Sequence, residues 1–175
     1  MNYNLYFPGK IIFGAGSIEK LAAELNVKDK ILLIVGKHAK DLGLLGRVNK
    51  ILTDFEIVTF CGVQAEVPLG VVDEIIKLGR ETKPSAVIAI GGGSVIDAAK
   101  AAAALIPLEG KTSDYFYNKK SIPGKGLFFA ALPTTAGTGT ECTPNSVLCD
   151  PETDIKKSIR HDTMFPDVAI IDPEL

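Results

Sequence analysis

The chain lacks tryptophan, has few cysteines and histidines, and carries no strong charge of either sign. Its 19 Lys and Arg residues nearly balance 21 Asp and Glu residues, so charge gives no reason to expect a nucleic acid or an anionic membrane as a partner. No apolar run approaches the roughly 18 residues of a membrane span. The start, MNYNLYFPGK, also lacks the basic segment and continuous apolar stretch of a signal peptide. We therefore expect neither a nucleic acid nor a membrane among its partners.

The three cysteines, Cys61, Cys142 and Cys149, are odd in number and show no CxxC spacing. Small secreted domains are commonly held by paired disulfides, whereas free thiols persist in a reducing compartment. We therefore expect three free thiols and a cytoplasmic location.

The sequence does have a regular alternation of short apolar runs and helical patterns. Short apolar runs typical of strands occupy residues 30–36, 55–60, 85–90, 126–132 and 168–172, and those at 30–36 and 85–90 suit strands buried on both faces of a parallel sheet. Apolar residues at helical spacing occupy residues 17–25, 44–53, 68–84 and 94–105. Ser17 is the expected N-cap of the first helix. This order predicts an α/β fold, a Rossmann-like open and mostly parallel sheet with helices on both faces.

Further strand pairs are expected near both ends of the chain. The segment LYFPGKIIFGAG indicates two short strands around a Pro8-Gly9 turn. Residues 145–150 and 156–161 flank PETD in a pattern typical of a hairpin. Because no repeat, low-complexity segment or linker interrupts the sequence, we expect a single domain over residues 1–175.

Three consecutive glycines, Gly91, Gly92 and Gly93, lie between a predicted strand and a predicted helix. The carboxyl end of a parallel strand is where open α/β sheets bind ligands. Glycines there allow positive φ angles and the close approach of an anion, and the helix adds the positive end of its dipole. A tight turn before a helix with a capping box of Ser94 and Asp97 would explain one glycine. Three in succession favour a phosphate-binding turn.

Two familiar phosphate-binding motifs do not fit the chain. The dinucleotide fingerprint GxGxxG fails because Ile96 occupies its last position. The sequence Gly110-Lys111-Thr112 lacks the leading glycine and the preceding strand of a Walker A loop.

A second loop, TTAGTGTECTPN over residues 134–145, follows the next predicted strand. Its hydroxyls and glycines suit a phosphorylated, hydroxyl-rich ligand, although Thr hydroxyls can equally bond their own backbone in a turn. Two such loops at one edge of a sheet are together a stronger indication than either alone.

The segments YFPGKIIFGAGSIEKL, ILLIVGK, GGGSVIDAAK, LPTTAGTGTE and FPDVAIIDPEL occur in an order that resembles the iron-dependent (group III) alcohol dehydrogenases. The resemblance implies a nicotinamide-binding α/β domain. The residues that it implies for the cofactor are Gly91, Gly92, Gly93 and Ser94 at the pyrophosphate, with Asp97 close by, Thr134, Thr135 and Thr138 in the second loop, Thr143 and Asn145 on the nicotinamide side, and Lys156 near the ribose, with Lys157 as the alternative.

Members of the resembling family are longer, and their metal ligands, an aspartate and histidines, lie in a helical domain beyond the point that matches Leu175. This chain has only His38 and His161. Cys142, Cys149 and His161 fit no standard zinc spacing. We therefore expect no metal site in this chain, and the proton donor is left open among His161, a lysine, a tyrosine and water.

The implied function is NAD(P)-dependent oxidation of a small alcohol or reduction of an aldehyde, with this chain as the cofactor-binding half of the enzyme. One alternative is a nucleotide-binding module without catalysis. Another is a glycerol dehydrogenase-like sister branch, although PTTAGTGTE favours the alcohol dehydrogenase branch. The sequence identifies no catalytic residue and no particular alcohol.

The residue after the first core strand predicts which cofactor is used. Enzymes that use NAD commonly place an acid there, where it accepts hydrogen bonds from the adenosine 2′-OH. Here Gly36 follows the strand Ile31–Val35. Lys37, His38 and Lys40 come next and could pair with a 2′-phosphate. The sequence therefore predicts NADP, with NAD as the second choice.

Apolar side chains along Tyr3–Phe7 and Ile11–Phe13 indicate a strand pair at a sheet edge. Unpaired edges tend to pair with another chain, and the resembling family joins its subunits through this region. We therefore expect a homodimer formed by the N-terminal strands.

Overall fold

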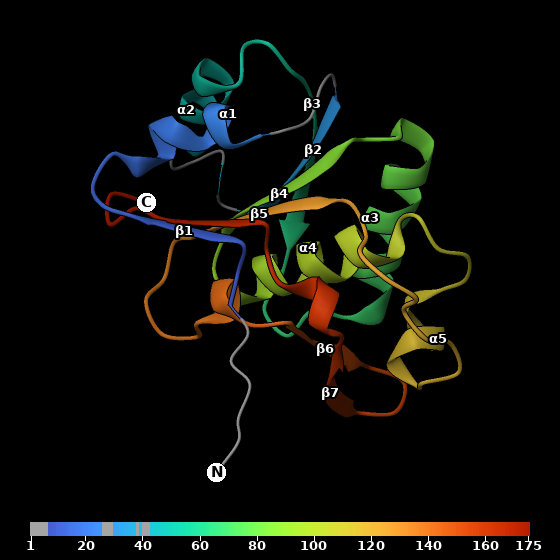
Figure 1. The fold of residues 1–175 in the computed structure, drawn as a ribbon. Helices are drawn as coiled ribbons and strands as arrows, with labels where there is room; N and C mark the ends of the chain where they lie inside the picture. The colour runs from blue at the N-terminus through green and yellow to red at the C-terminus, as the bar shows by residue number, and fades with distance from the viewer. Residues whose placement is uncertain (1–6, 26–29, 38, 40–42) are drawn as a thin grey trace.

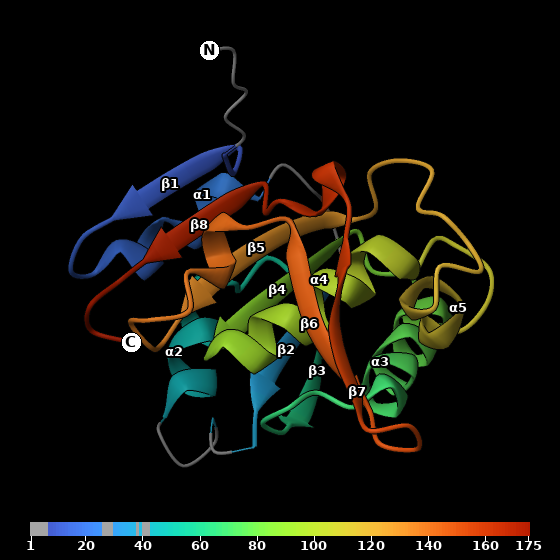
Figure 2. The same cartoon turned by 90° about the horizontal axis from the view of Figure 1, so that it is seen from below.

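The structure is a computed structural model that describes residues 7–25, 30–37, 39 and 43–175. Its centre is a six-stranded sheet in the order β1-β8-β5-β4-β2-β3, in which every pair of neighbours is parallel (Figures 1 and 2). The strands are β1 (Lys10–Phe13), β2 (Lys30–Gly36), β3 (Glu56–Val63), β4 (Ala86–Gly91), β5 (Phe128–Pro133) and β8 (Val168–Ile171). The predicted α/β fold is confirmed, because each predicted apolar run forms one strand of this sheet.

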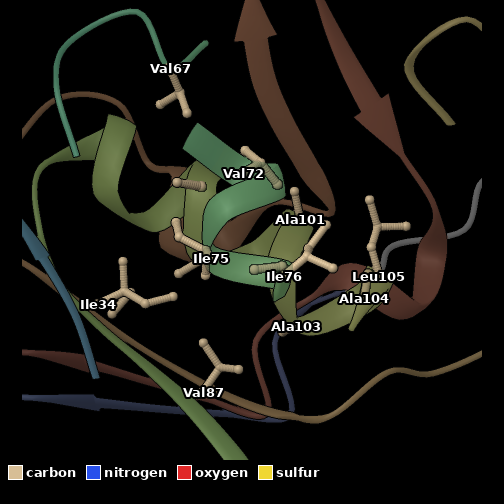
Figure 3. Packing of buried hydrophobic residues seen from close by; sticks show 14 of the residues in the cluster. Ile34, Val67, Val72, Ile75, Ile76, Val87, Ala101, Ala103, Ala104 and Leu105 are labelled. Atoms are coloured by element: carbon tan, nitrogen blue, oxygen red, sulfur yellow. The ribbon is translucent and has the colours of Figure 1, made fainter. Parts of the chain in front are cut away.

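Helices cover both faces of the sheet. Successive side chains of a strand point to opposite faces, so the apolar residues of β2, β4 and β5 contribute to two separate cores. The helical elements are η1 (Ser17–Lys20), α1 (Leu21–Glu24), α2 (Leu44–Ile51), α3 (Leu69–Thr82), α4 (Gly93–Leu105), α5 (Thr112–Phe116), η2 (Thr140–Cys142) and η3 (Asp162–Met164). Along β2, Leu32 and Ile34 pack in the same core as α3 and α4. The alternate residues Ile31, Leu33 and Val35 pack on the other face with α1 and α2. Figure 3 shows the first core, with Ile34 and Val87 of the sheet below Ile75 of α3.

Helix α4 is buried on nearly all sides, as expected of a helix that is apolar all round. Every residue from Val95 to Leu105 is buried. Gly126 packs directly against the backbone of this helix, because a Cβ added there would lie only 2.1 Å from the carbonyl oxygen of Ala103. Two of the buried residues, Asp97 and Lys100, nevertheless carry ionisable groups.

The predicted hairpin is confirmed as β6 (Asn145–Asp150) and β7 (Ile155–Arg160), which pair in antiparallel fashion outside the main sheet. Strand β6 packs on α4, so that this helix lies between the sheet and the hairpin (Figures 1 and 2). The hydroxyl of Tyr117 donates a hydrogen bond of 2.6 Å to the carboxylate of Asp150. The loop before β6 reaches the start of α4, where Thr138 lies against Gly93.

The cap of the first helical segment differs from the prediction. Gly16, with a φ angle of 71°, is the N-cap of η1, and Ser17 is not. The N–H groups of Gly16 and Ile18 donate to the carboxylate of Asp172, each over 3.1 Å. The prediction was wrong because the acceptor comes from the far end of the chain, after β8.

Strand β1 confirms the second of the two predicted N-terminal strands, and it pairs with β8 at the edge of the sheet. The first, Tyr3–Phe7, falls mainly on residues 3–6, which lie outside the described residues. Within the described ranges, no helix combines the length and apolar character needed to cross a membrane.

Candidate functional site

Two adjoining pockets open at the edge of the sheet where β2, β3, β4 and β5 end. The apolar pocket, of about 330 Å³, is lined by Gly36, Lys37, Ala39, Leu44, Val63, Gln64, Ala65, Ile90, Gly91, Gly92, Val95 and Thr134. The polar pocket, of about 450 Å³, is lined by Ala65, Glu66, Val67, Gly93, Ser94, Asp97, Thr138, Thr140, Thr143, Asn145, Val147 and Lys156. The two pockets share Ala65 and meet at the glycine turn, and together they are called the cleft below.

The structure brings the predicted cofactor-binding residues together. All of them except Thr135 line one of the two pockets of the cleft. The Thr135 hydroxyl would lie 3.5 Å from a Cβ added at Gly92, so it stands beside the glycine turn. The residues Lys40 and His38, which were expected near the adenosine end, lie outside the described residues.

The glycine turn is shaped by close packing rather than by positive φ angles. None of Gly91, Gly92 and Gly93 has a positive φ, which corrects that part of the prediction. A Cβ at Gly91 would lie 2.7 Å from Val95 Cγ2, and one at Gly93 would lie 2.9 Å from Thr138. Gly92 is the N-cap of α4, and no described side chain caps that helix. Its first N–H groups are therefore available to an anion in the cleft.

Asp97 does not form the capping box with Ser94 that was the alternative explanation of the glycine turn. Its carboxylate instead accepts a hydrogen bond from the hydroxyl of Thr140, while its carbonyl oxygen accepts one of 2.7 Å from Ser146. Burial raises the pKa of the Asp97 carboxyl, and the Thr140 bond and the charge of Lys100 oppose this shift. Asp97 therefore joins α4 to the second loop, because its carboxylate is hydrogen-bonded to Thr140 of that loop and not to the N-terminal end of its own helix.

The second loop crosses the glycine turn. The Thr134 N–H donates to the carbonyl oxygen of Gly91 over 3.0 Å, which joins the two loops where β4 and β5 end. Gly137 and Gly139 have φ angles of 153° and 62°, which other residues rarely adopt. These two glycines allow the loop to turn back so that Thr138 covers Gly93.

Lys100 is the feature of the site that the sequence did not reveal. Its Nζ atom lies 2.6 Å from the carbonyl oxygen of Thr140, 2.7 Å from that of Thr143 and 2.8 Å from that of Asn145. The side chain is 1% exposed, and burial lowers the pKa of its ammonium to about 8. The one signal in the sequence is its place, three residues after Asp97, in a helix that otherwise has only apolar or small residues beyond its first turn.

Asn145 carries an acceptor that the chain itself does not use. Its Oδ1 atom is buried and has no hydrogen-bond partner among the described residues. Since an unpaired buried acceptor is costly, and Asn145 lines the polar pocket, this atom is suited to a donor from a bound molecule.

Lys156, and not Lys157, lines the cleft. The Lys156 ammonium lies 2.9 Å from the carboxylate of Glu66, which also lines the polar pocket. This hydrogen bond lowers the pKa of Glu66 and raises that of Lys156. The Lys157 ammonium lies instead over the rings of Phe116 and Tyr117, so Lys156 is the one of the two lysines that faces the cleft.

His161 is not brought to the cleft, since its Nδ1 atom lies 2.8 Å from the Thr163 hydroxyl and it lines a different pocket. Cys61, Cys142 and Cys149 all have free thiols. In the part of the chain that the structure describes, no three His, Cys, Asp or Glu side chains form a group that could hold a metal ion. We therefore assign no metal ligand in the cleft.

Comparison with known sequences gives the family of this arrangement. The family model for iron-containing alcohol dehydrogenases matches residues 8–173. A long-chain primary alcohol dehydrogenase, AdhA, from Thermoanaerobacter ethanolicus is 38% identical over 93% of this chain and 43% of its own length. A probable NADH-dependent butanol dehydrogenase 2 from Bacillus subtilis is 37% identical (99% and 45%), and an NADPH-dependent butanol dehydrogenase from Clostridium saccharobutylicum is 35% identical (96% and 44%).

Solved structures give the same result for the fold. The NADH-dependent butanol dehydrogenase A of Thermotoga maritima superposes with a TM-score of 0.91 at 34% identity, covering 98% of this chain and 44% of that one. A sulfoacetaldehyde reductase of Bifidobacterium kashiwanohense in complex with NAD+ has a TM-score of 0.89 at 34% identity, covering 99% and 47%. The chain thus spans less than half the length of the proteins that it matches.

Proposed function

The chain belongs to the iron-containing alcohol dehydrogenase family, and from that premise we propose that residues 1–175 form the dinucleotide-binding half of an NAD(P)-dependent alcohol dehydrogenase. The observation that carries the proposal is the pair of pockets that meet at an uncapped glycine turn. A dinucleotide has two nucleoside ends joined by a pyrophosphate, and the cleft has two compartments joined by an anion-binding helix end.

The proposed placement follows from the lining of the cleft. The pyrophosphate lies at Gly91–Ser94, where the first N–H groups of α4 are free. The adenosine end occupies the apolar pocket beside Gly36 and Lys37. The nicotinamide end occupies the polar pocket beside Thr138, Thr143 and Asn145, and Lys156 contacts its ribose.

The residues present fit such a cofactor. The buried and unpartnered Oδ1 of Asn145 offers an acceptor to an amide or hydroxyl donor. The open side of Gly92, where an added Cβ meets nothing closer than 3.5 Å, leaves the backbone accessible to a phosphate. When bound, the nicotinamide supplies the hydride chemistry, whereas the residues of this chain bind and orient it.

For the whole protein we propose oxidation of a small alcohol and reduction of the corresponding aldehyde. The relatives named as butanol and long-chain alcohol dehydrogenases support this class of substrate. Because the described residues offer no metal-binding group, we derive no step of the reaction that passes through a metal in this half.

We propose NADP as the preferred cofactor. Gly36 lines the apolar pocket without a carboxylate that would repel a 2′-phosphate, and the neighbouring Lys37 is exposed there. The relatives include both an NADH-dependent and an NADPH-dependent butanol dehydrogenase, so the family as a whole does not fix the choice. The absence of an acid at Gly36 is what favours NADP in this chain.

We also propose a homodimer that forms through β1. This strand lies at the edge of the sheet, and Ile11 and Phe13 are 46% and 74% exposed. Apolar side chains on an edge strand favour pairing with a second chain. Light scattering tests the dimer: only a species of 18.6 kDa at working concentration would contradict it.

The test of the proposed function is a titration of the chain with NADPH and with NADH, followed by the fluorescence of the reduced nicotinamide. Saturable binding at one site per chain is the expected result. An assay of nicotinamide absorbance with small alcohols and aldehydes, with and without a chelator, then shows whether this half turns over or only binds. The absence of binding by either dinucleotide would contradict the proposal.

A further inference from the structure

The environment of Lys100 is unusual for a lysine inside a helix. Besides the three carbonyl oxygens, its Nζ atom lies 3.3 Å from the hydroxyl oxygens of both Thr140 and Thr143. Five oxygen atoms of one loop therefore surround a single ammonium group. An ammonium has three donors and no acceptor, so the three shortest contacts account for all of its hydrogens.

The charge of Lys100 is partly balanced from the same side. Asp97 lies one turn earlier on α4, and Thr140 contacts both groups through its hydroxyl. The charge of Glu141 on η2 also favours the charged form of Lys100, and so would the thiolate of Cys142, whose pKa is raised mainly by burial. Burying an ammonium is costly unless it is paired and hydrogen-bonded, so this arrangement is maintained against a real desolvation penalty.

The three residues that Lys100 contacts are all part of the lining of the polar pocket. Thr140, Thr143 and Asn145 face the pocket, whereas Lys100 lies behind them and does not line it. The carbonyl of Asn145 is bound by Lys100, while its side-chain Oδ1 is the unpartnered acceptor described above. The position of that acceptor therefore depends on a contact made on the far side of the loop.

We propose that Lys100 is a positioning residue for the nicotinamide end of the cofactor. Its ammonium gathers the carbonyl oxygens of Thr140, Thr143 and Asn145 around one point, in the manner of a bound monovalent cation. This fixes the loop 138–145 in the shape that the polar pocket requires. The inference rests on the proposed function for the identity of the ligand, but the order of the loop can be measured without any ligand.

A lysine that only filled space in the core would behave differently. Its replacement by an apolar side chain of similar length would leave the loop ordered, and added amines would have no effect. If the ammonium of Lys100 holds the three carbonyl oxygens, the order of the loop depends on N–H donors at that position. In a variant with a truncated side chain, a small amine that binds in the vacated space could supply those donors.

The experiment compares the parent chain with Lys100→Ala and Lys100→Met, and with Lys77→Ala as a matched control, since Lys77 is exposed on α3. Hydrogen exchange of residues 138–145 is followed in each, and NADPH and NADH are titrated. We expect both Lys100 variants to exchange faster in the loop and to bind the dinucleotides at least about tenfold more weakly, because three carbonyls lose their donor. The control should match the parent.

Rescue of Lys100→Ala by amines makes the test specific. Propylammonium carries the missing N–H donors and should restore loop protection and most of the binding, whereas tetramethylammonium has the same charge but no N–H donor and should not. If Lys100→Ala fails to fold by circular dichroism, loop exchange in Lys100→Met decides.

The proposal is overturned if the loop of a folded Lys100 variant exchanges at the parent rate. It is also overturned if propylammonium has no more effect than tetramethylammonium. If the parent chain binds neither NADPH nor NADH, the proposed function fails, while the exchange arm without ligand still tests Lys100.

Discussion

The apolar pocket and the polar pocket adjoin at the glycine turn but are built by different means. The apolar pocket is formed where the parallel strands β2, β3 and β4 end, and its walls include the last residue of each of these strands. The polar pocket is formed by a loop whose backbone is held from behind by Lys100, at a sequence separation of 40 residues or more. One half of the cleft therefore depends on strand ends, and the other on buried charge.

The largest expected effect tests whether the polar pocket rests on a buried charge. Burial lowers the pKa of Lys100 to about 8 in the folded chain, from an ordinary value of 10.5. Between these pH values the unfolded chain holds a proton that the folded chain has released, so the free energy of unfolding rises with pH. Relative to Lys100→Met, the parent should gain about 3 kcal/mol as the pH rises from about 8 to 10.5, lose that gain as the pH falls back to about 8, and show no further change below pH 8.

Urea unfolding at several pH values measures that difference, and Lys77→Met, at an exposed position on α3, is the matched control. A difference between the parent and Lys100→Met that does not change with pH would show that Lys100 titrates as an ordinary lysine.

The next effect concerns the turn that both pockets share. A Cβ at Gly92 meets only Thr135, at 3.5 Å, so Gly92→Val should fold with little change in melting temperature. The valine would nevertheless occupy the space through which a pyrophosphate reaches the backbone, and dinucleotide binding should weaken on the order of 100-fold. Gly124→Val, at a glycine with nothing within 4 Å and outside the cleft, is the control. Unchanged binding by a folded Gly92→Val would place the ligand elsewhere.

A smaller effect should be confined to the apolar pocket. At Gly36 a Cβ would meet only Val95 Cγ2, at 3.6 Å, so Gly36→Asp fits without a clash. The new carboxylate should repel a 2′-phosphate and accept hydrogen bonds from a 2′-OH. We expect a preference for NADPH of about tenfold in the parent and its reversal in the variant. Equal or tighter binding of NADH by the parent would contradict the choice of NADP.

The smallest effect concerns the ion pair between Lys156 and Glu66, which both line the polar pocket. Lys156 and Glu66 are both largely exposed, with side-chain exposures of 54% and 71%. Because exposed pairs contribute little, Glu66→Gln should leave the melting temperature nearly unchanged. It should also release Lys156 for the ribose and strengthen dinucleotide binding by less than about threefold. Weaker binding in Glu66→Gln would show that Glu66 itself contacts the ligand.

Much of the apolar half could be predicted from the sequence, because its causes are local. A continuous apolar run such as Ile31–Val35 suits only a strand buried on both faces, and the structure places it in β2 with all five side chains buried. The glycine turn was identified from its place between a strand and a helix, although its glycines serve close packing and not positive φ angles.

The polar half could be predicted only in part, since its contacts join distant segments. Thr138, Thr143 and Asn145 were found through the resemblance, but Lys100 was not, because nothing in an alanine-rich helix shows which loop a lysine will meet. The errors have the same cause. The alternative of a capping box at Asp97 fails because its carboxylate meets Thr140, and the predicted cap at Ser17 is provided by Gly16 and Asp172 instead.

The central claim is that one dinucleotide spans both pockets, and hydrogen exchange with and without saturating NADPH tests it most directly. We expect protection of three segments together: residues 63–67, which line both pockets, residues 91–97 at the glycine turn, and residues 134–145 of the second loop. Residues 115–122, which line a separate pocket, should not change. Protection of only one half of the cleft, or of residues 115–122 in its place, would contradict the account.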